Sequence, residues 1–136
     1  MKVLSILTWN ACSLGEHRRA ELELKCSREE IDVVVICEAK RDEPVSGFDD
    51  YLQLVNNQTL MFVHKRLSFV KMDSYSIYQP FVETITILLE GMVLIGAYCR
   101  NGNYKDGIQE VLNMVEWLKA QDNPVCVIGD LNARCD

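Results

Sequence analysis

Residues 125–132 read VCVIGDLN, a short run of mostly β-branched and apolar residues that ends in an acid and an amide. Runs of this length and composition predict a β-strand. Because strand side chains alternate between two faces, Asp130 and Asn132 share a face with Cys126 and Ile128. A carboxylate at the end of a buried apolar row must be paired or metal-bound, since burying it bare is very unfavourable. The stretch therefore predicts a strand that delivers polar groups to a site.

Three other predicted strands end in the same way. Asn10 follows a strand at residues 3–9, Glu38 ends one at residues 31–38, and Tyr98 lies near the end of one at residues 92–99. Alternation then assigns the faces: Asn10 with Leu4 and Ile6, Glu38 with Val34 and Ile36, Tyr98 with Met92 and Leu94. The carboxyl ends of parallel strands lie along one sheet edge, where ligands tend to bind. We expect these polar ends to meet at one such edge.

The pattern along the chain changes once. Ser13 and Glu16 have the form of a capping box and predict a helix that runs to about Glu30, so the chain opens as strand, helix, strand, with a parallel strand pair. Strand then follows strand, at residues 51–55, 59–64, 67–72 and 84–89, and Glu90-Gly91 predicts a hairpin turn before residues 92–99. A second helix is predicted at residues 106–120, with Trp117 in packing contact. No linker or repeat interrupts residues 1–136, which form a single domain.

The composition of the chain limits the kinds of partner and the cellular compartment that we expect. The net charge of -6 and the pI near 4.9 argue against a broad electrostatic grip on nucleic acid, although a bound cation can mediate phosphate contact. The six cysteines contain no CxxC pair and several lie in apolar runs, which indicates reduced thiols. The opening residues 1–10 are too short and turn polar too soon to predict a signal peptide, and no apolar stretch approaches the length of a membrane span. We expect an intracellular protein of the cytoplasm or nucleus, not secreted and without a membrane partner.

Taken singly, each polar strand end has an ordinary structural explanation. Asp130 and Asn132 suit an Asx turn, Glu38 an exposed strand end, and Tyr98 the rim of a core. Asn10 equally suits a turn or a cap. Together, two carboxylates and two amides make a hard-oxygen site that suits Mg²⁺ or Mn²⁺. Such a cation neutralises a phosphate, polarises its phosphorus and helps to generate hydroxide.

Four motifs carry a family resemblance: TWN at residues 8–10, ICE at 36–38, GAY at 96–98 and GDLNA at 129–133. In this order they resemble the first four motifs of the endonuclease/exonuclease/phosphatase family, which has the deoxyribonuclease-I-like fold. Their spacing suits its apurinic-endonuclease-like branch, which includes the endonuclease domains of non-LTR retrotransposons. The resemblance implies an α+β fold, the N-terminal part of a four-layer α/β/β/α sandwich with mixed sheets. It also implies Mg²⁺-dependent phosphodiester hydrolysis, and the enzyme that we expect is a DNA-binding endonuclease that acts on nucleic acid.

The resemblance also implies a role for each matched residue. Glu38 would be the main metal ligand, with Asn10 orienting that carboxylate or touching the metal. Tyr98 would donate a hydrogen bond to the phosphate, and Asp130 would orient and deprotonate the attacking water. Asn132 would hold the phosphate in its transition state. Where the family usually has a proline soon after the tyrosine, this chain has Arg100, which would add a phosphate contact.

The family's late catalytic Asp and His have no counterpart, because His17 and His64 lie elsewhere in the pattern. We therefore expect a C-terminally truncated domain with little activity of its own. A missing second sheet would leave one apolar face uncovered, and a homodimer or a partner chain would cover it; that face carries Leu4, Ile6, Val34, Ile36 and Ile128. Two alternatives stay open. One is a phosphoinositide, sphingolipid or nucleotide phosphoesterase of the same fold, and the other a non-catalytic remnant that acts as a binding module.

Overall fold

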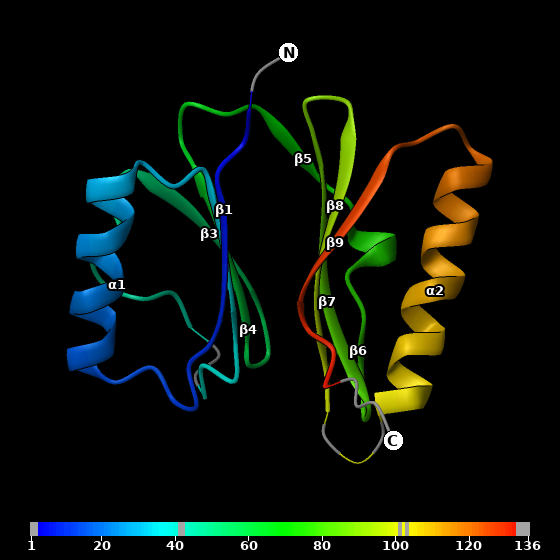
Figure 1. Ribbon diagram of the computed structural model, residues 1–136, viewed down its shortest axis with the longest axis horizontal. Helices are drawn as coiled ribbons and strands as arrows, with labels where there is room; N and C mark the ends of the chain where they lie inside the picture. The colour runs from blue at the N-terminus through cyan, green and yellow to red at the C-terminus, as the bar shows by residue number, and fades with distance from the viewer. Residues whose placement is uncertain (1–2, 41–42, 101, 103, 133–136) are drawn as a thin grey trace.

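The protein has four layers, in the order helix, sheet, sheet, helix (Figure 1). The computed structural model describes residues 3–40, 43–100, 102 and 104–132. Helix α1 (Glu16–Glu29) covers the outer face of one sheet and α2 (Tyr104–Ala120) covers the outer face of the other. The two sheets pack against each other in the middle. This is the α/β/β/α arrangement of the α+β class that the sequence predicted.

Both sheets are mixed. The first has the order β1-β2-β4-β3 and consists of β1 (Ile6–Asn10), β2 (Val33–Cys37), β4 (Thr59–His64) and β3 (Tyr51–Asn56). The second has the order β5-β7-β8-β9 and consists of β5 (Phe69–Lys71), β7 (Val82–Leu89), β8 (Met92–Cys99) and β9 (Val125–Asp130). The two-residue strand β6 (Tyr78–Gln79) also pairs with β7, and a 3-10 turn η1 (Asp73–Tyr75) precedes it. The parallel pairs are β1–β2, joined through α1, and β8–β9, joined through α2.

Most predicted elements lie where the sequence indicated, with β4 and β8 matching residue for residue. The hairpin turn is also confirmed, because Glu90 and Gly91 both have positive φ, at 48° and 80°. The prediction of a capping box at Ser13 and Glu16 is wrong. Helix α1 begins after Gly15, whose position carries no side-chain cap, and Ser13 has left the helical region with φ at 92°. The strand β6 was not predicted, since two residues give too short a pattern to read.

Three apolar clusters fill the spaces between the layers. One lies between α1 and the first sheet, one between the two sheets, and one between the second sheet and α2. The packing prediction for Trp117 is wrong, because this side chain on α2 is 61% exposed. The apolar residues of β2 alternate between the first two clusters, so that sheet is buried on both faces.

The predicted uncovered sheet face is not present. Val34 and Ile36 are fully buried beneath α1. Leu4, Ile6 and Ile128 lie on the other side, against the cluster between the sheets. The five residues therefore belong to two faces, and the second sheet that was expected to be missing is formed by β5, β7, β8 and β9.

The open part of the fold is an edge, not a face. Strands β1 and β9 are the last strands of their sheets and lie side by side (Figure 1). Every residue of β9 is partly exposed, whereas every residue of β8 after Met92 is buried. The opposite edges are protected. The Gln53 amide of β3 exchanges two hydrogen bonds with the Val45 backbone, and β5 is short and carries Lys71.

The described cysteines, which are Cys12, Cys26, Cys37, Cys99 and Cys126, are free thiols. Burial raises the pKa of Cys37 to about 12 and that of Cys99 to about 11, so both remain protonated at neutral pH. Among the described residues, no helix combines the length and apolar character that crossing a membrane requires.

Close approach of the two sheets predicts a specific steric limit at Gly96 of β8. A Cβ there would lie 3.0 Å from the Met61 methyl carbon and 3.2 Å from both methyl carbons of Val35. We expect Gly96→Ala to lower the free energy of unfolding by about 1–3 kcal/mol, because an overpacked core must shift. Urea denaturation measures the change. The control is Gly15→Ser, whose Cβ meets nothing within 4 Å and whose hydroxyl suits the N-cap position, so it should stay within about 0.5 kcal/mol of the parent. Equal effects of the two substitutions would contradict this packing.

Candidate active site

Three polar side chains meet at the carboxyl ends of β1, β2 and β9. The Asn10 Nδ2 amide donates to the Glu38 carboxylate and, over 2.7 Å, to Oδ2 of Asp130. Its own Oδ1 accepts from the Cys12 backbone N–H at 3.1 Å, which fixes the direction of the amide. Because Glu38 follows a strand of the first sheet and Asp130 ends a strand of the second, one amide ties the two sheets together at this end.

Glu38 reaches this cluster through an unusual backbone turn. Strand alternation would place its side chain with Val34 and Ile36, on the face covered by α1. Instead, Glu38 has φ at 54°, in the left-handed region, and lies just beyond the end of β2. The face predicted for Glu38 is therefore wrong, because this residue belongs to a turn and no longer alternates with the strand. A non-glycine residue in this region costs about 1 kcal/mol or more, which the surrounding contacts must offset.

Asp130 is positioned by a close approach of β9 to β8. Gly129 has φ at 138°, and a Cβ on it would lie 1.9 Å from the Ala97 carbonyl oxygen, so only glycine fits. Asp130 then lies directly opposite Tyr98 in the parallel pair. Its Oδ1 accepts from the Asn132 backbone N–H at 3.0 Å, which is an Asx turn. The Asn132 amide in turn donates to the Cys99 carbonyl oxygen at 2.5 Å and holds this turn against β8.

Tyr98 lies next to Glu38 with only 7% of its surface exposed. Burial, the charge of Glu38, a hydrogen bond with that carboxylate and the charge of Asp130 together raise the pKa of Tyr98 to about 12. The positive charge of Arg100 acts in the opposite direction. At neutral pH the phenol is therefore protonated and is a hydrogen-bond donor beside the carboxylate cluster.

Arg100 is held by protein groups. Its guanidinium pairs with the Glu83 carboxylate and donates to the Gln79 carbonyl oxygen at 3.2 Å. Glu83 is fully buried on β7, and it also accepts hydrogen bonds from the turn between β3 and β4; the donors are Asn57 Nδ2 at 2.8 Å, the Gln58 backbone N–H at 3.0 Å and Thr59 Oγ1 at 3.0 Å. Sequence reasoning missed Glu83. The available signal was a single charged residue in an apolar and threonine-rich strand.

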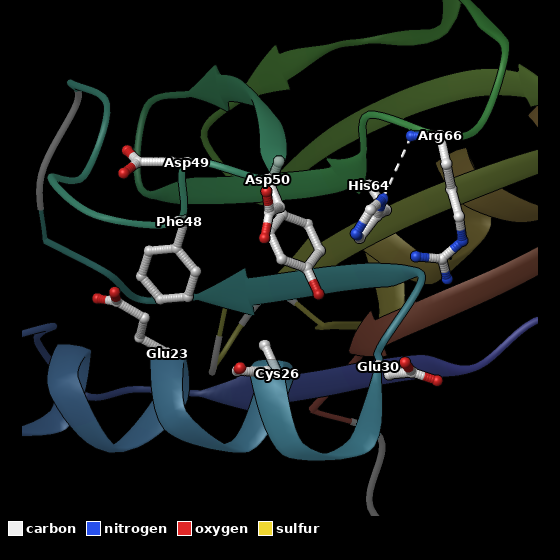
Figure 2. Close-up of a pocket in the computed structure, with 10 residues that line it drawn as sticks. Glu23, Cys26, Glu30, Phe48, Asp49, Asp50, His64 and Arg66 are labelled. Atoms are coloured by element: carbon white, nitrogen blue, oxygen red, sulfur yellow. Dashed lines mark hydrogen bonds between the residues drawn. The ribbon is translucent and has the colours of Figure 1, made fainter.

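Both histidines lie away from the cluster of Asn10, Glu38 and Asp130. His64 ends β4, and its backbone N–H donates to the Asp32 carbonyl oxygen, at the opposite end of β2 from Glu38. It borders a pocket of about 320 Å³ between α1 and the end of β4 (Figure 2). The His64 imidazole makes an edge-to-face contact with the Tyr51 ring, with the ring centres 5.1 Å apart. His17 is exposed on α1, 3.0 Å from Glu21. Within the described ranges, no three His, Cys, Asp or Glu side chains form a group that could hold a metal ion.

The fold of this chain is similar to that of several solved structures. No family model and no curated protein sequence matches this chain. Solved structures do. The endonuclease domain of TRAS1, a telomere-specific non-LTR retrotransposon, is similar with a TM-score of 0.62 at 12% identity over 94% of this chain and 60% of that one. D. rerio TDP2 in complex with single strand DNA product has a TM-score of 0.67 at 18% identity over 97% and 62%. An AP endonuclease from Archaeoglobus fulgidus has a TM-score of 0.58 at 15% identity over 96% and 58%.

These similarities confirm the fold that the sequence motifs implied. The chain has the deoxyribonuclease-I-like architecture of the endonuclease/exonuclease/phosphatase structures, and it spans about 60% of the length of the solved chains that it matches. At identities below 20% the similarity concerns architecture and not chemistry.

The contact between Tyr98 and Glu38 predicts a pH dependence. A tyrosine whose pKa is raised by folding from 10 to about 12 stabilises the fold below pH 10, and this contribution is lost as the pH rises through that interval. Glu38→Gln removes the carboxylate charge, so we expect the pKa of Tyr98 to fall part of the way back. The pKa is measured from the ultraviolet absorbance of the ionised phenol during a pH titration. The step that disappears in Tyr98→Phe is the one that belongs to Tyr98. An unchanged titration curve in Glu38→Gln would contradict the contact.

Proposed function

We propose that the ends of β1, β2, β8 and β9 form part of a Mg²⁺-dependent phosphodiester hydrolase site that acts on nucleic acid. The observation that carries this proposal is the single Asn10 amide shared by two carboxylates from different sheets. The similar solved structures support it at the level of fold, since they include two endonucleases and a TDP2 bound to a single-stranded DNA product.

The donor chemistry fits a hard divalent cation. Two carboxylates held close together repel each other, and a divalent cation offsets that repulsion. Mg²⁺ typically binds through one or two carboxylates and leaves its other positions to water and to substrate phosphate. Glu38 would hold the ion, with Asp130 and the Asn10 amide beside it. When bound, the ion would neutralise the phosphate and polarise its phosphorus.

The chain's own residues would carry the remaining steps. Asn10 orients both carboxylates through its two N–H groups. Asp130 would accept the proton of the attacking water, in the role of a general base. Tyr98, protonated because of its raised pKa, would donate to a phosphate oxygen. We assign Asn132 to holding the turn that fixes Asp130, since its amide already donates to β8.

We propose a corresponding role for Arg100, which the resemblance marked as a phosphate ligand. The guanidinium is paired with Glu83 and lies 5.8 Å from the centre of the Tyr98 ring. Arg100 would therefore hold the Tyr98 ring in place and place a positive charge beside it. A direct contact between Arg100 and the phosphate would be secondary. The Asp and His that the resemblance adds late in the family's site have no counterpart among the described residues, so we expect slow hydrolysis by this chain alone.

The metal proposal is tested by binding as well as by rate. Isothermal titration with Mg²⁺ should show a site that Glu38→Ala abolishes, and Mg²⁺ should raise the melting temperature of the parent but not of this variant. Cleavage of an abasic-site oligonucleotide should require Mg²⁺ and fall by at least about 10²-fold in Glu38→Ala. The matched control is Glu43→Ala, an exposed acid in the following loop. Mg²⁺ binding that persists without Glu38 would rule out this site, and cleavage of inositol phosphates in place of DNA would identify the alternative substrate.

We further propose that a second copy of this chain pairs with the open edge formed by β1 and β9. The exposed backbone edges of two stacked strands are a template for pairing, and this edge lacks the lysine, proline and short-strand protection that prevents it. Up to Asn10 in β1 and Asp130 in β9, neither strand carries a charged side chain, so a like strand meets no local repulsion. The opposite edges, with Gln53 and Lys71, are protected.

Sedimentation velocity tests the edge proposal. The parent should show a concentration-dependent dimer, and Thr8→Lys, at an exposed position of β1, should shift it to monomer because a lysine on a pairing edge opposes association. Val70→Lys on β5, which is 62% exposed, is the control and should leave the dimer intact. A parent that is monomeric at all concentrations would refute this pairing.

A further inference from the structure

A row of side chains leads from the candidate site across the second sheet. In the strand register Asp130 lies opposite Tyr98, Tyr98 opposite Glu83, and Glu83 opposite Tyr78. Directly opposed residues share a face of the sheet, so the four positions form one continuous strip. Three inter-strand spacings of about 4.8 Å separate its ends, or roughly 14 Å. The strip begins at the proposed reaction centre and ends at the short strand β6.

Arg100 fixes the outer half of this strip. Its guanidinium carbon lies 5.8 Å from the centre of the Tyr98 ring and 5.9 Å from that of the Tyr78 ring. It is itself immobilised by Glu83, which is fully buried and accepts four hydrogen bonds in all. A Tyr78 ring in contact with a fixed cation is preorganised, because cation–π contact restrains its rotamers.

The Tyr78 ring is nevertheless 59% exposed. An aromatic side chain gains most by burial, so a restrained ring left open beside a polar site offers a flat surface for a planar ligand. The other strongly exposed aromatic residue among those whose exposure the structure gives, Trp117, belongs to α2, the helix that covers the outer face of the second sheet (Figure 1).

We propose that Tyr78 is a stacking platform for an unpaired nucleobase, and that the substrate of this site is single-stranded nucleic acid. This inference rests on the proposed function and specifies its substrate class. Single-stranded nucleic acids are bound by stacking bases on aromatic rings, at roughly 1–3 kcal/mol per base. Stacking also suits a chain with net charge -6, because Arg100, the cation beside Tyr78, is already paired with Glu83 and is not free to attract a phosphate. A phosphoinositide headgroup has no aromatic ring to place there.

The test is metal-free binding to the full chain, measured by fluorescence anisotropy. The probes are a labelled oligonucleotide of eight deoxythymidines and an abasic deoxyribose-phosphate oligomer of equal length. We expect the parent to bind the deoxythymidine probe more tightly than the abasic one. Tyr78→Ala should weaken deoxythymidine binding roughly 5- to 150-fold and leave abasic binding unchanged.

Two further variants separate stacking from general effects. Tyr78→Phe keeps the ring and should bind the deoxythymidine probe within about twofold of the parent, because stacking does not use the hydroxyl. Trp117→Ala removes an equally exposed aromatic side chain, 61% against 59%, and should change nothing. Thermal unfolding verifies that each variant is folded. The proposal is overturned if Tyr78→Ala binds as the parent does, if it weakens both probes equally, or if the parent does not prefer bases.

The two proposals can fail separately. Tyr78-dependent binding without Mg²⁺-dependent cleavage would leave the platform and remove the hydrolase function. Cleavage that depends on Glu38, with binding that is indifferent to Tyr78, would leave the hydrolase and remove the platform.

Discussion

Face-to-face packing of the two sheets is the constraint on which the rest of this structure depends. Each sheet alone carries only part of the candidate site: Asn10 and Glu38 come from the first, Tyr98 and Asp130 from the second. The sheets approach closely because Gly96 leaves room for the Met61 and Val35 side chains. Two polar links, one partly buried and one fully buried, then fix the relative position of the sheets at the site end. One is the Asn10 amide, and the other is the Glu83 carboxylate, which accepts donors from the turn between β3 and β4.

These links also explain how carboxylates remain stable near a core. Burying a charge is unfavourable unless hydrogen bonds or an opposite charge compensate it. Glu83 is compensated completely, by Arg100 and by three donors from the other sheet, and this suits a structural role. Glu38 and Asp130 share the Asn10 amide; Glu38 also has the Tyr98 hydroxyl and Asp130 the Asn132 backbone N–H, but neither forms a salt bridge with a described residue. That lower degree of compensation, at the exposed end of the strands, is what a site for a divalent cation and a phosphate requires. The structural carboxylate of Glu83 and the site carboxylates of Glu38 and Asp130 therefore differ in how far hydrogen bonds and opposite charges compensate them.

Much of the fold was predictable from local patterns. The runs at β4 and β8, the Glu90-Gly91 turn and the amphipathic α2 carry strong period-two, turn and period-3.6 signals, and the structure confirms them. The start of α1 was misassigned because Ser13 and Glu16 imitate a capping box, whereas the chain turns through positive φ at Ser13 and begins the helix after Gly15. The apolar residues Val34 and Ile128 were assigned to one uncovered face because alternation gives the parity of a strand but not which layer covers it.

The sequence by itself determined which residues stand at the strand ends, because apolar periodicity and the order of four short motifs are local properties of the chain. It therefore indicated Asn10, Glu38, Tyr98 and Asp130 before any contact was known. Only the tertiary structure decided how they meet. The left-handed turn at Glu38 redirects its carboxylate, and Gly129 brings Asp130 against β8. The register that aligns Tyr78, Glu83, Tyr98 and Asp130 joins strands far apart in the chain. Such pairings depend on non-local hydrogen bonding and close packing, which no local pattern of residues encodes.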